Sequence, residues 1–205
     1  MDYTFLKDNR IVPVVVIKDI GETVPKLNAL KDGGINIAEI TFRTACAADA
    51  ISLAVKECPD MLIGAGTVIN ARQCQQALNA GAKFIVSPGF SREVCQMCTD
   101  SGIPYLPGAV TPTEIMTAAS FGLSVLKFFP AGVYGGLKGL KALSAAFPDI
   151  RFMPTGGVDE SNLAEYLRET DKVVAVGGSW MMKGGYADIA EASGRAVLIA
   201  GGITE

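Results

Sequence analysis

The chain has 205 residues, a formal net charge of −3 and no histidine. This charge balance gives no electrostatic case for binding nucleic acid, and no apolar run approaches the roughly 18 residues of a membrane span. Without histidine, Ser-His-Asp and Cys-His nucleophile systems and histidine-based metal sites are excluded.

The N-terminal residues 1–8 lack the basic-then-apolar layout of a signal peptide. The cysteines are odd in number, five in all, which is typical of reduced thiols rather than a disulfide framework. We therefore expect a cytoplasmic protein.

Eight short apolar runs alternate with segments of helical spacing along the chain. The helical segments have recognisable starts, such as Asn70 and the capping box that Thr111 and Glu114 form around Pro112. Strands that are apolar on both faces and joined by helices indicate a parallel sheet covered by helices. Eight such units in one domain, residues 1–205, predict a single (β/α)₈ TIM barrel. The expected strands are Val12–Ile17, Ile37–Thr41, Met61–Gly66, Phe84–Ser87, Ile103–Pro107, Val125–Phe129, Arg151–Thr155 and Val173–Gly177.

Two lone charges stand inside these apolar runs. Glu39 lies in the second expected strand, and Lys127 is the only charge between Leu123 and Phe129. Loss of water disfavours the ammonium form of a lysine, and a neutral amine on a rigid strand is what Schiff-base chemistry on a carbonyl needs. The two charges therefore suggest a catalytic pair; a structural ion pair is the alternative.

Polar residues and glycines gather where the strands end, which is where barrel chemistry is found. Arg43 follows the second strand as a candidate carboxylate clamp or a plain surface cation. Thr67 follows the third, either as a binding hydroxyl or as a turn residue. Paired glycines end the last two strands, at Thr155-Gly156-Gly157 and Gly177-Gly178-Ser179. Because such loops let the backbone approach an anion, they predict a phosphate site, with tight turns as the alternative.

With these residues assembled, the chain resembles the 2-keto-3-deoxy-6-phosphogluconate (KDPG) aldolases, many of which also cleave 4-hydroxy-2-oxoglutarate (KHG). The match runs in order along nearly the whole chain. The segments that carry it are residues 39–44 (EITFRT), 64–68 (GAGTV), 87–89 (SPG), 126–131 (LKFFPA), 154–158 (PTGGV) and 177–180 (GGSW).

The resemblance implies a class I lyase without metal or cofactor, assembled as a homotrimer, that takes small 2-keto acids. It implies cleavage of KDPG to pyruvate and glyceraldehyde 3-phosphate, and of KHG to pyruvate and glyoxylate. It assigns Lys127 as the Schiff-base lysine and Glu39 as the acid/base. The residues it implies around the pyruvate part are Arg43, Thr67, Pro88 and Phe129. The residues it implies around the phosphate are Thr155, Gly156, Gly157, Gly178 and Ser179.

The sequence departs from the family at one point. Many members carry an arginine at the end of the first strand that contributes to the distal anion site. This chain has Lys18 there, which can take its place as a flexible point charge rather than a bidentate fork. Three other functions stay open: a 6-phosphogalactonate aldolase, a phosphosugar isomerase and a non-catalytic phosphate-binding barrel. The isomerase would normally use a carboxylate, cysteine or histidine acid/base pair and no buried lysine on the sixth strand. The non-catalytic barrel has no reason to keep both Glu39 and Lys127 in apolar strands.

Overall fold

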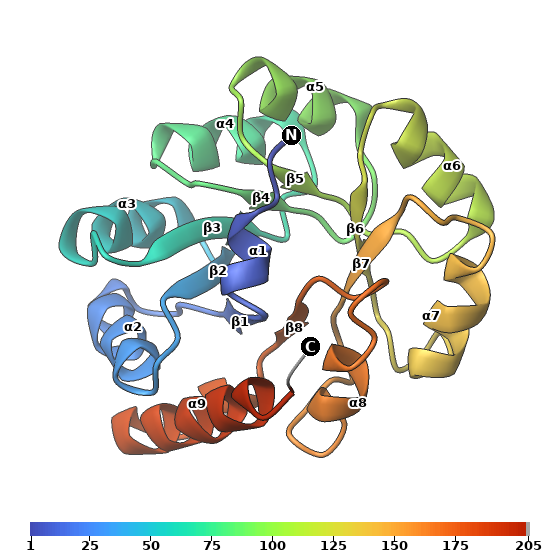
Figure 1. The fold of residues 1–205 in the computed structure, drawn as a ribbon. Helices are drawn as coiled ribbons and strands as arrows, with labels where there is room; N and C mark the ends of the chain where they lie inside the picture. The colour runs from blue at the N-terminus through green and yellow to red at the C-terminus, as the bar shows by residue number, and fades with distance from the viewer. Residues whose placement is uncertain (204–205) are drawn as a thin grey trace.

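A computed structural model of the chain describes residues 1–203. Figure 1 shows strands gathered in the middle and helices arranged around them. The helices are α1 (Phe5–Asp8), α2 (Thr23–Asp32), α3 (Ala47–Glu57), α4 (Ala71–Asn79), α5 (Arg92–Asp100), α6 (Pro112–Ser120), α7 (Gly136–Ser144), α8 (Leu163–Leu167) and α9 (Tyr186–Gly201), with the 3-10 helices η1 (Ile20–Glu22) and η2 (Trp180–Met182). The strands are β1 (Ile11–Val15), β2 (Ile37–Thr41), β3 (Leu62–Gly66), β4 (Ile85–Val86), β5 (Tyr105–Leu106), β6 (Val125–Phe128), β7 (Arg151–Pro154) and β8 (Val176–Gly178).

The strands form a curled parallel sheet. Six of them are hydrogen-bonded in the order β5-β4-β3-β2-β1-β8, and β6 and β7 form a separate parallel pair. Isolated parallel bridges lie at the two junctions between these sheets: Gly108 with Lys127, and Thr155 with Gly177. All strands therefore point the same way, and their C-terminal ends lie at one edge, where the predicted site residues were expected.

The sequence patterns located the elements better than they located the strand ends. Strands β4 and β5 are only two residues long, shorter than predicted. Pro104 and Pro107 flank β5, and because proline has no backbone N–H it cannot donate to a ladder. The predicted helix starts are confirmed: Asn70 accepts from the Gln73 N–H, and Thr111 and Glu114 form the capping box.

Helix α1 lies across the middle of the ring of strands in Figure 1. Its Leu6 is fully buried, and its Phe5 ring stacks on Phe84 with centroids 5.2 Å apart. The Tyr3 hydroxyl donates to the Tyr105 carbonyl at 2.9 Å. Phe84 and Tyr105 lie at the starts of β4 and β5, so α1 covers the N-terminal end of the sheet and leaves the opposite end open for a site.

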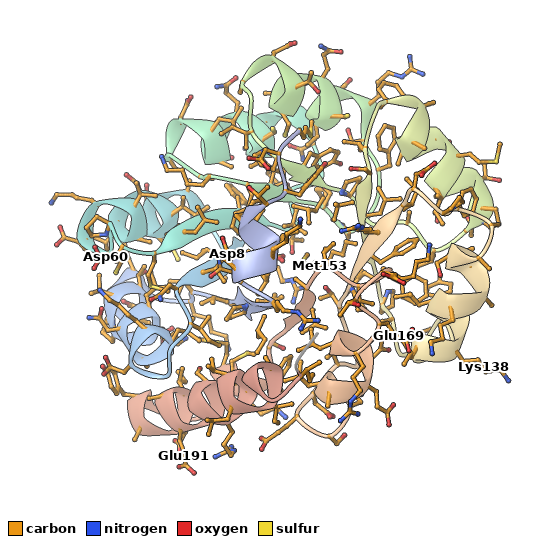
Figure 2. The ribbon with its side chains drawn as sticks, in the orientation of Figure 1. Asp8, Asp60, Lys138, Met153, Glu169 and Glu191 are labelled. Carbon is orange, nitrogen blue, oxygen red and sulfur yellow. The ribbon has the colours of Figure 1, made fainter. Side chains whose placement is uncertain are left out.

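Side-chain polarity follows this layering. Figure 2 shows Met153 near the middle of the molecule and Asp60, Lys138 and Glu191 at its periphery. Met153 is fully buried, whereas the three charged residues are exposed. Within the described residues, no helix combines the length and the apolar character that crossing a membrane requires.

Candidate active site

The two lone charges of the sequence meet in the interior. Lys127 Nζ donates to Glu39 Oε1 at 3.4 Å, with the lysine side chain 4% exposed and the glutamate fully buried. Lys127 comes from β6 and Glu39 from β2, so two strands that are distant in sequence bring them together. A buried amine beside a buried carboxylate can attack a carbonyl and exchange protons with its neighbour.

Glycines on β3 make room for the Glu39 side chain. Glu39 pairs with Gly64 across the β2–β3 ladder, and its carboxylate reaches towards Gly66. A Cβ atom at Gly66 would lie 1.9 Å from Glu39 Oε1, closer than any real contact allows. The sequence predicts a strand end at these glycines, but only the structure shows that Gly66 makes space for the Glu39 carboxylate.

The aromatic ring of Phe129 forms one wall beside the amine. Lys127 Nζ lies 5.0 Å from the centroid of this ring, within the range of a cation–π contact. The other neighbour of the ring is Gly156, where a Cβ atom would lie 3.3 Å from it. Phe129 therefore stands between the charged pair and the glycine turn that follows β7.

Arg43 and Thr67 also meet, at the ends of β2 and β3. Arg43 Nε donates to Thr67 Oγ1 at 3.3 Å, and Arg43 is exposed. Thr67 has φ +56°, the left-handed region that residues other than glycine rarely adopt. The turn thus holds the hydroxyl and the guanidinium together, an arrangement that a carboxylate ligand can use.

Pro88 follows Ser87, which accepts a hydrogen bond from the segment after β5. The Gly108 N–H donates to the Ser87 carbonyl at 3.0 Å, and Gly108 forms the bridge to Lys127. A Cβ atom at Gly108 would lie 2.0 Å from the Pro88 carbonyl oxygen, so Pro88 packs closely at this point. Pro88 itself is exposed at the strand end.

A cleft of about 380 Å³ opens at the ends of β7 and β8. Gly156 and Gly157 line it. Their φ angles of +81° and +84° form a left-handed turn, which glycine adopts at the least steric cost. The lining residues predicted from the sequence are Arg43, Phe129, Thr155, Gly156, Gly157, Gly178 and Ser179. Five of these seven form the predicted phosphate group, which the fold therefore brings together around one cleft.

The lysine at this cleft is Lys183 rather than Lys18. Lys183 follows η2 and lines the cleft, together with Asp159 and Trp180. Lys18 is exposed after β1 and does not belong to the lining. The lysine also helps to hold the pKa of Asp159 below its usual value, although hydrogen bonds from Ser161 contribute most. Lys183 is not among the residues predicted from the sequence; its one signal there is that it is the only basic residue between Lys172 and Arg195.

No group of three histidine, cysteine, aspartate or glutamate side chains within residues 1–203 is arranged to hold a metal ion. The observed site consists of an amine, a carboxylate, an arginine–threonine pair and a cleft lined by glycine turns.

Known proteins are similar to this chain in both sequence and fold. The family model for KDPG and KHG aldolase matches residues 3–193. The chain is similar to the 2-dehydro-3-deoxy-phosphogluconate aldolase of Treponema pallidum, with 48% identity over 84% of this chain and 82% of that protein. It is also similar to the KHG/KDPG aldolase of Escherichia coli K12, with 41% identity over 87% of this chain and 84% of that one.

Among solved structures, the chain is similar to the KDPG aldolase of Legionella pneumophila, in which pyruvate was captured at low pH as a covalent carbinolamine intermediate. The two share 38% identity with a TM-score of 0.85, over 98% of this chain and 96% of that chain. The family model spans far more than half of the sequence, and the relatives are similar along most of their own length. The chain belongs to the KDPG and KHG aldolase family.

Proposed function

We propose that this protein is a class I aldolase that cleaves KDPG to pyruvate and glyceraldehyde 3-phosphate, and KHG to pyruvate and glyoxylate. The observation that carries the proposal is the contact between Lys127 and Glu39 inside the sheet. The names of the relatives from Treponema pallidum and Escherichia coli support the two substrates. The carbinolamine in the Legionella pneumophila protein supports covalent capture of pyruvate by an amine.

The reaction begins at the C2 ketone of the substrate. The Lys127 amine adds to C2 to form a carbinolamine, and loss of water gives an iminium. When the C4 hydroxyl loses its proton, the C3–C4 bond breaks: its electron pair moves to the iminium and forms an enamine, while C4 becomes the aldehyde. Protonation of the enamine at C3 and hydrolysis release pyruvate and regenerate the amine.

Glu39 carries the protons in this scheme. It lies within contact of Lys127 Nζ, so it can donate to the carbinolamine hydroxyl and later accept the proton from C4–OH. Arg43 and Thr67 hold the substrate carboxylate, with Pro88 and Phe129 as the walls of the pyruvate pocket. No metal or cofactor is needed, because the iminium accepts the electrons.

The cleft at the ends of β7 and β8 is the place for the phosphate. Thr155, Gly156, Gly157, Gly178 and Ser179 offer backbone and hydroxyl groups there, and Lys183 supplies a positive charge. The positive charges of Arg43 and Lys183 outnumber the single carboxylate of Asp159 on this wall, which favours an anion. We assign to Lys183 the role that the sequence suggested for Lys18.

We further infer that the eight strands close into one (β/α)₈ barrel in a single domain. The bridges between Gly108 and Lys127 and between Thr155 and Gly177 support this, because they lie where the two sheets adjoin. The homotrimer implied by the family and the cytoplasmic location remain predictions. Light scattering on the purified protein measures the first of these.

Borohydride trapping tests the proposed function. Pyruvate plus borohydride should add one reduced pyruvate to Lys127 and inactivate the protein. Mass spectrometry of proteolytic peptides locates the adduct, and a sample with borohydride alone is the control. An adduct on another lysine, or no adduct, would sink the assignment. Neither a phosphosugar isomerase nor a silent phosphate-binding barrel forms such an adduct, and kinetics on KDPG and its galactonate epimer distinguish the two aldolases.

A further inference from the structure

Thr41, the last residue of β2, carries a hydroxyl that the proposed mechanism does not yet use. The residue is fully buried, and within the described residues its Oγ1 has no hydrogen-bond partner. A buried hydroxyl without a partner costs free energy that valine, which has the same shape, would avoid. The presence of threonine at this position therefore calls for a reason other than stability.

Thr41 lies on β2 close to the Glu39 carboxylate, which suggests a functional reason for the hydroxyl. Thr41 and Glu39 are two residues apart on β2, so their side chains share the inner face. Thr41 pairs with Gly66, and the Glu39 carboxylate reaches the same glycine. The hydroxyl and the carboxylate thus lie at one level of the sheet.

The carboxylate offers a matching atom. Glu39 Oε1 accepts from Lys127, but Oε2 is buried and has no partner among residues 1–203. Two buried oxygen atoms at one level, each without a partner and not bonded to each other, can share one small hydroxyl-bearing group between them. That group would lie beside the Lys127 amine.

We propose that Thr41 is a positioning residue for proton transfer by Glu39, an inference that rests on the proposed aldolase function. The Thr41 hydroxyl and Glu39 Oε2 together hold the O–H group that exchanges its proton with the carboxylate. In the cleavage step the proton on the C4 oxygen passes to Glu39 Oε2, directly or through one water. The C3–C4 electron pair moves to the iminium, and C4 becomes the carbonyl carbon of the aldehyde. The Thr41 hydroxyl holds the oxygen of this O–H group so that its proton points at Glu39 Oε2.

The test compares two variants at this position with a matched control. Thr41→Val keeps the shape and removes the hydroxyl, and Thr41→Ser keeps the hydroxyl. Thr23→Val is the control, because Thr23 is also fully buried with an unpartnered hydroxyl but lies on α2, outside the sheet. We expect Thr41→Val to lower kcat about 10- to 100-fold with little change in KM, as for loss of a group that assists acid–base catalysis. Thr41→Ser should recover most of this loss, and Thr23→Val should keep the wild-type kcat.

The Tm of Thr41→Val distinguishes a positioning role from a structural one, because loss of a structural contact would lower it. Because valine removes an unpartnered buried hydroxyl, the Tm of Thr41→Val should equal or exceed that of the wild type. Wild-type kcat in Thr41→Val would overturn the proposal, and so would equal losses in the valine and serine variants. A loss of kcat that accompanies a lowered Tm in Thr41→Val would also overturn it.

A second reaction separates this inference from the proposed function. The exchange of pyruvate methyl protons with heavy water passes through the iminium and enamine but involves no C4 hydroxyl. If Thr41 holds a water molecule, Thr41→Val slows both exchange and cleavage; if it holds the substrate hydroxyl, cleavage alone slows. Either result supports the proposal. Borohydride should still trap pyruvate on Lys127 in Thr41→Val, whereas a wild type without this adduct would overturn the aldolase function and this inference with it.

Discussion

The two halves of the site differ in how they are built. Lys127 and Glu39 are buried, and the two charges contact each other in the interior. At the cleft beyond Phe129, Gly157, Ser179 and Lys183 are exposed. The first region consists of two buried charged side chains in contact, and the second of backbone turns with the exposed cations Arg43 and Lys183. Electrostatic interactions are strong in the dry interior and weak, and screened by salt, at the exposed cleft.

This difference suggests that the interior and the cleft have separate roles, bond breaking and substrate recognition. Bond breaking needs a nucleophile and a proton carrier in fixed geometry, which we propose that Lys127 and Glu39 provide in the interior. Recognition of a phosphate, which we propose for the exposed cleft, needs several donors, each of which contributes little. Changes in the interior should therefore act on kcat by orders of magnitude, and changes at the cleft should act modestly on KM. The following variants test that division.

Replacing Lys127 by methionine should have the largest effect. We expect turnover to fall at least about 10⁴-fold, because the nucleophile is lost. Glu39 would also be left buried without its cation, which costs about 3 kcal/mol of the free energy of unfolding. Steady-state kinetics and thermal denaturation measure the two effects. The control is the double variant Lys127→Met with Glu39→Gln, which should regain stability without regaining activity. Measurable turnover in either variant contradicts the assignment of Lys127.

Glu39→Gln should have the next largest effect. We expect turnover to fall about 10²- to 10⁴-fold, the usual contribution of a positioned acid or base. The pyruvate adduct should still form on Lys127, because the nucleophile remains. Stopped-flow kinetics and mass spectrometry of the trapped protein separate the two. Near wild-type turnover would mean that Glu39 is only a structural partner of Lys127.

Gly66→Ala should act on the interior without removing any functional group. The added methyl carbon would lie 1.9 Å from Glu39 Oε1, so the carboxylate must move. We expect about a 10²-fold loss of turnover and a destabilisation of about 1–3 kcal/mol, as for overpacking of a core. Gly194→Ala is the control, because a Cβ atom there meets nothing within 4 Å. Full activity in Gly66→Ala would show that the carboxylate position is not critical.

Lys183→Ala should have the smallest effect. We expect KM for KDPG to rise about three- to tenfold at low salt and the difference to shrink as salt rises, because exposed charges are screened. The shorter KHG should be nearly unaffected. Lys18→Ala is the matched control, an exposed lysine that does not line the cleft. Equal losses on both substrates, or a larger effect of Lys18→Ala, would contradict the role of Lys183.

The sequence predicted the interior region better than the cleft. Glu39 and Lys127 stand out because a charge in an apolar run is rare, and parallel strands bring such residues to one end of a sheet. Their contact is observed, and their roles remain predictions. The family and its fold class were also recognisable from the sequence, because the motifs occur in order along most of the chain.

The positions that depend on loop paths could not be predicted in this way. Lys18 and Lys183 are both exposed lysines after strands, and only the path of the chain through η2 places the second at the cleft. The space that Gly66 leaves for the Glu39 carboxylate depends on the register between β2 and β3, which the apolar pattern does not fix. Thr41 has no exceptional sequence signal, because a threonine in a strand is ordinary.

Phe129 belongs to both regions: its ring lies 5.0 Å from Lys127 Nζ and also lines the cleft beside Gly156. Since β6 and β7 are hydrogen-bonded and the ring lies beside both the amine and Gly156, we expect the scaffold to fix the distance from the amine to the cleft. We therefore expect that a keto acid whose phosphate lies the right number of carbons from its carbonyl reaches both regions at once, and that one a carbon shorter or longer reaches only one of them.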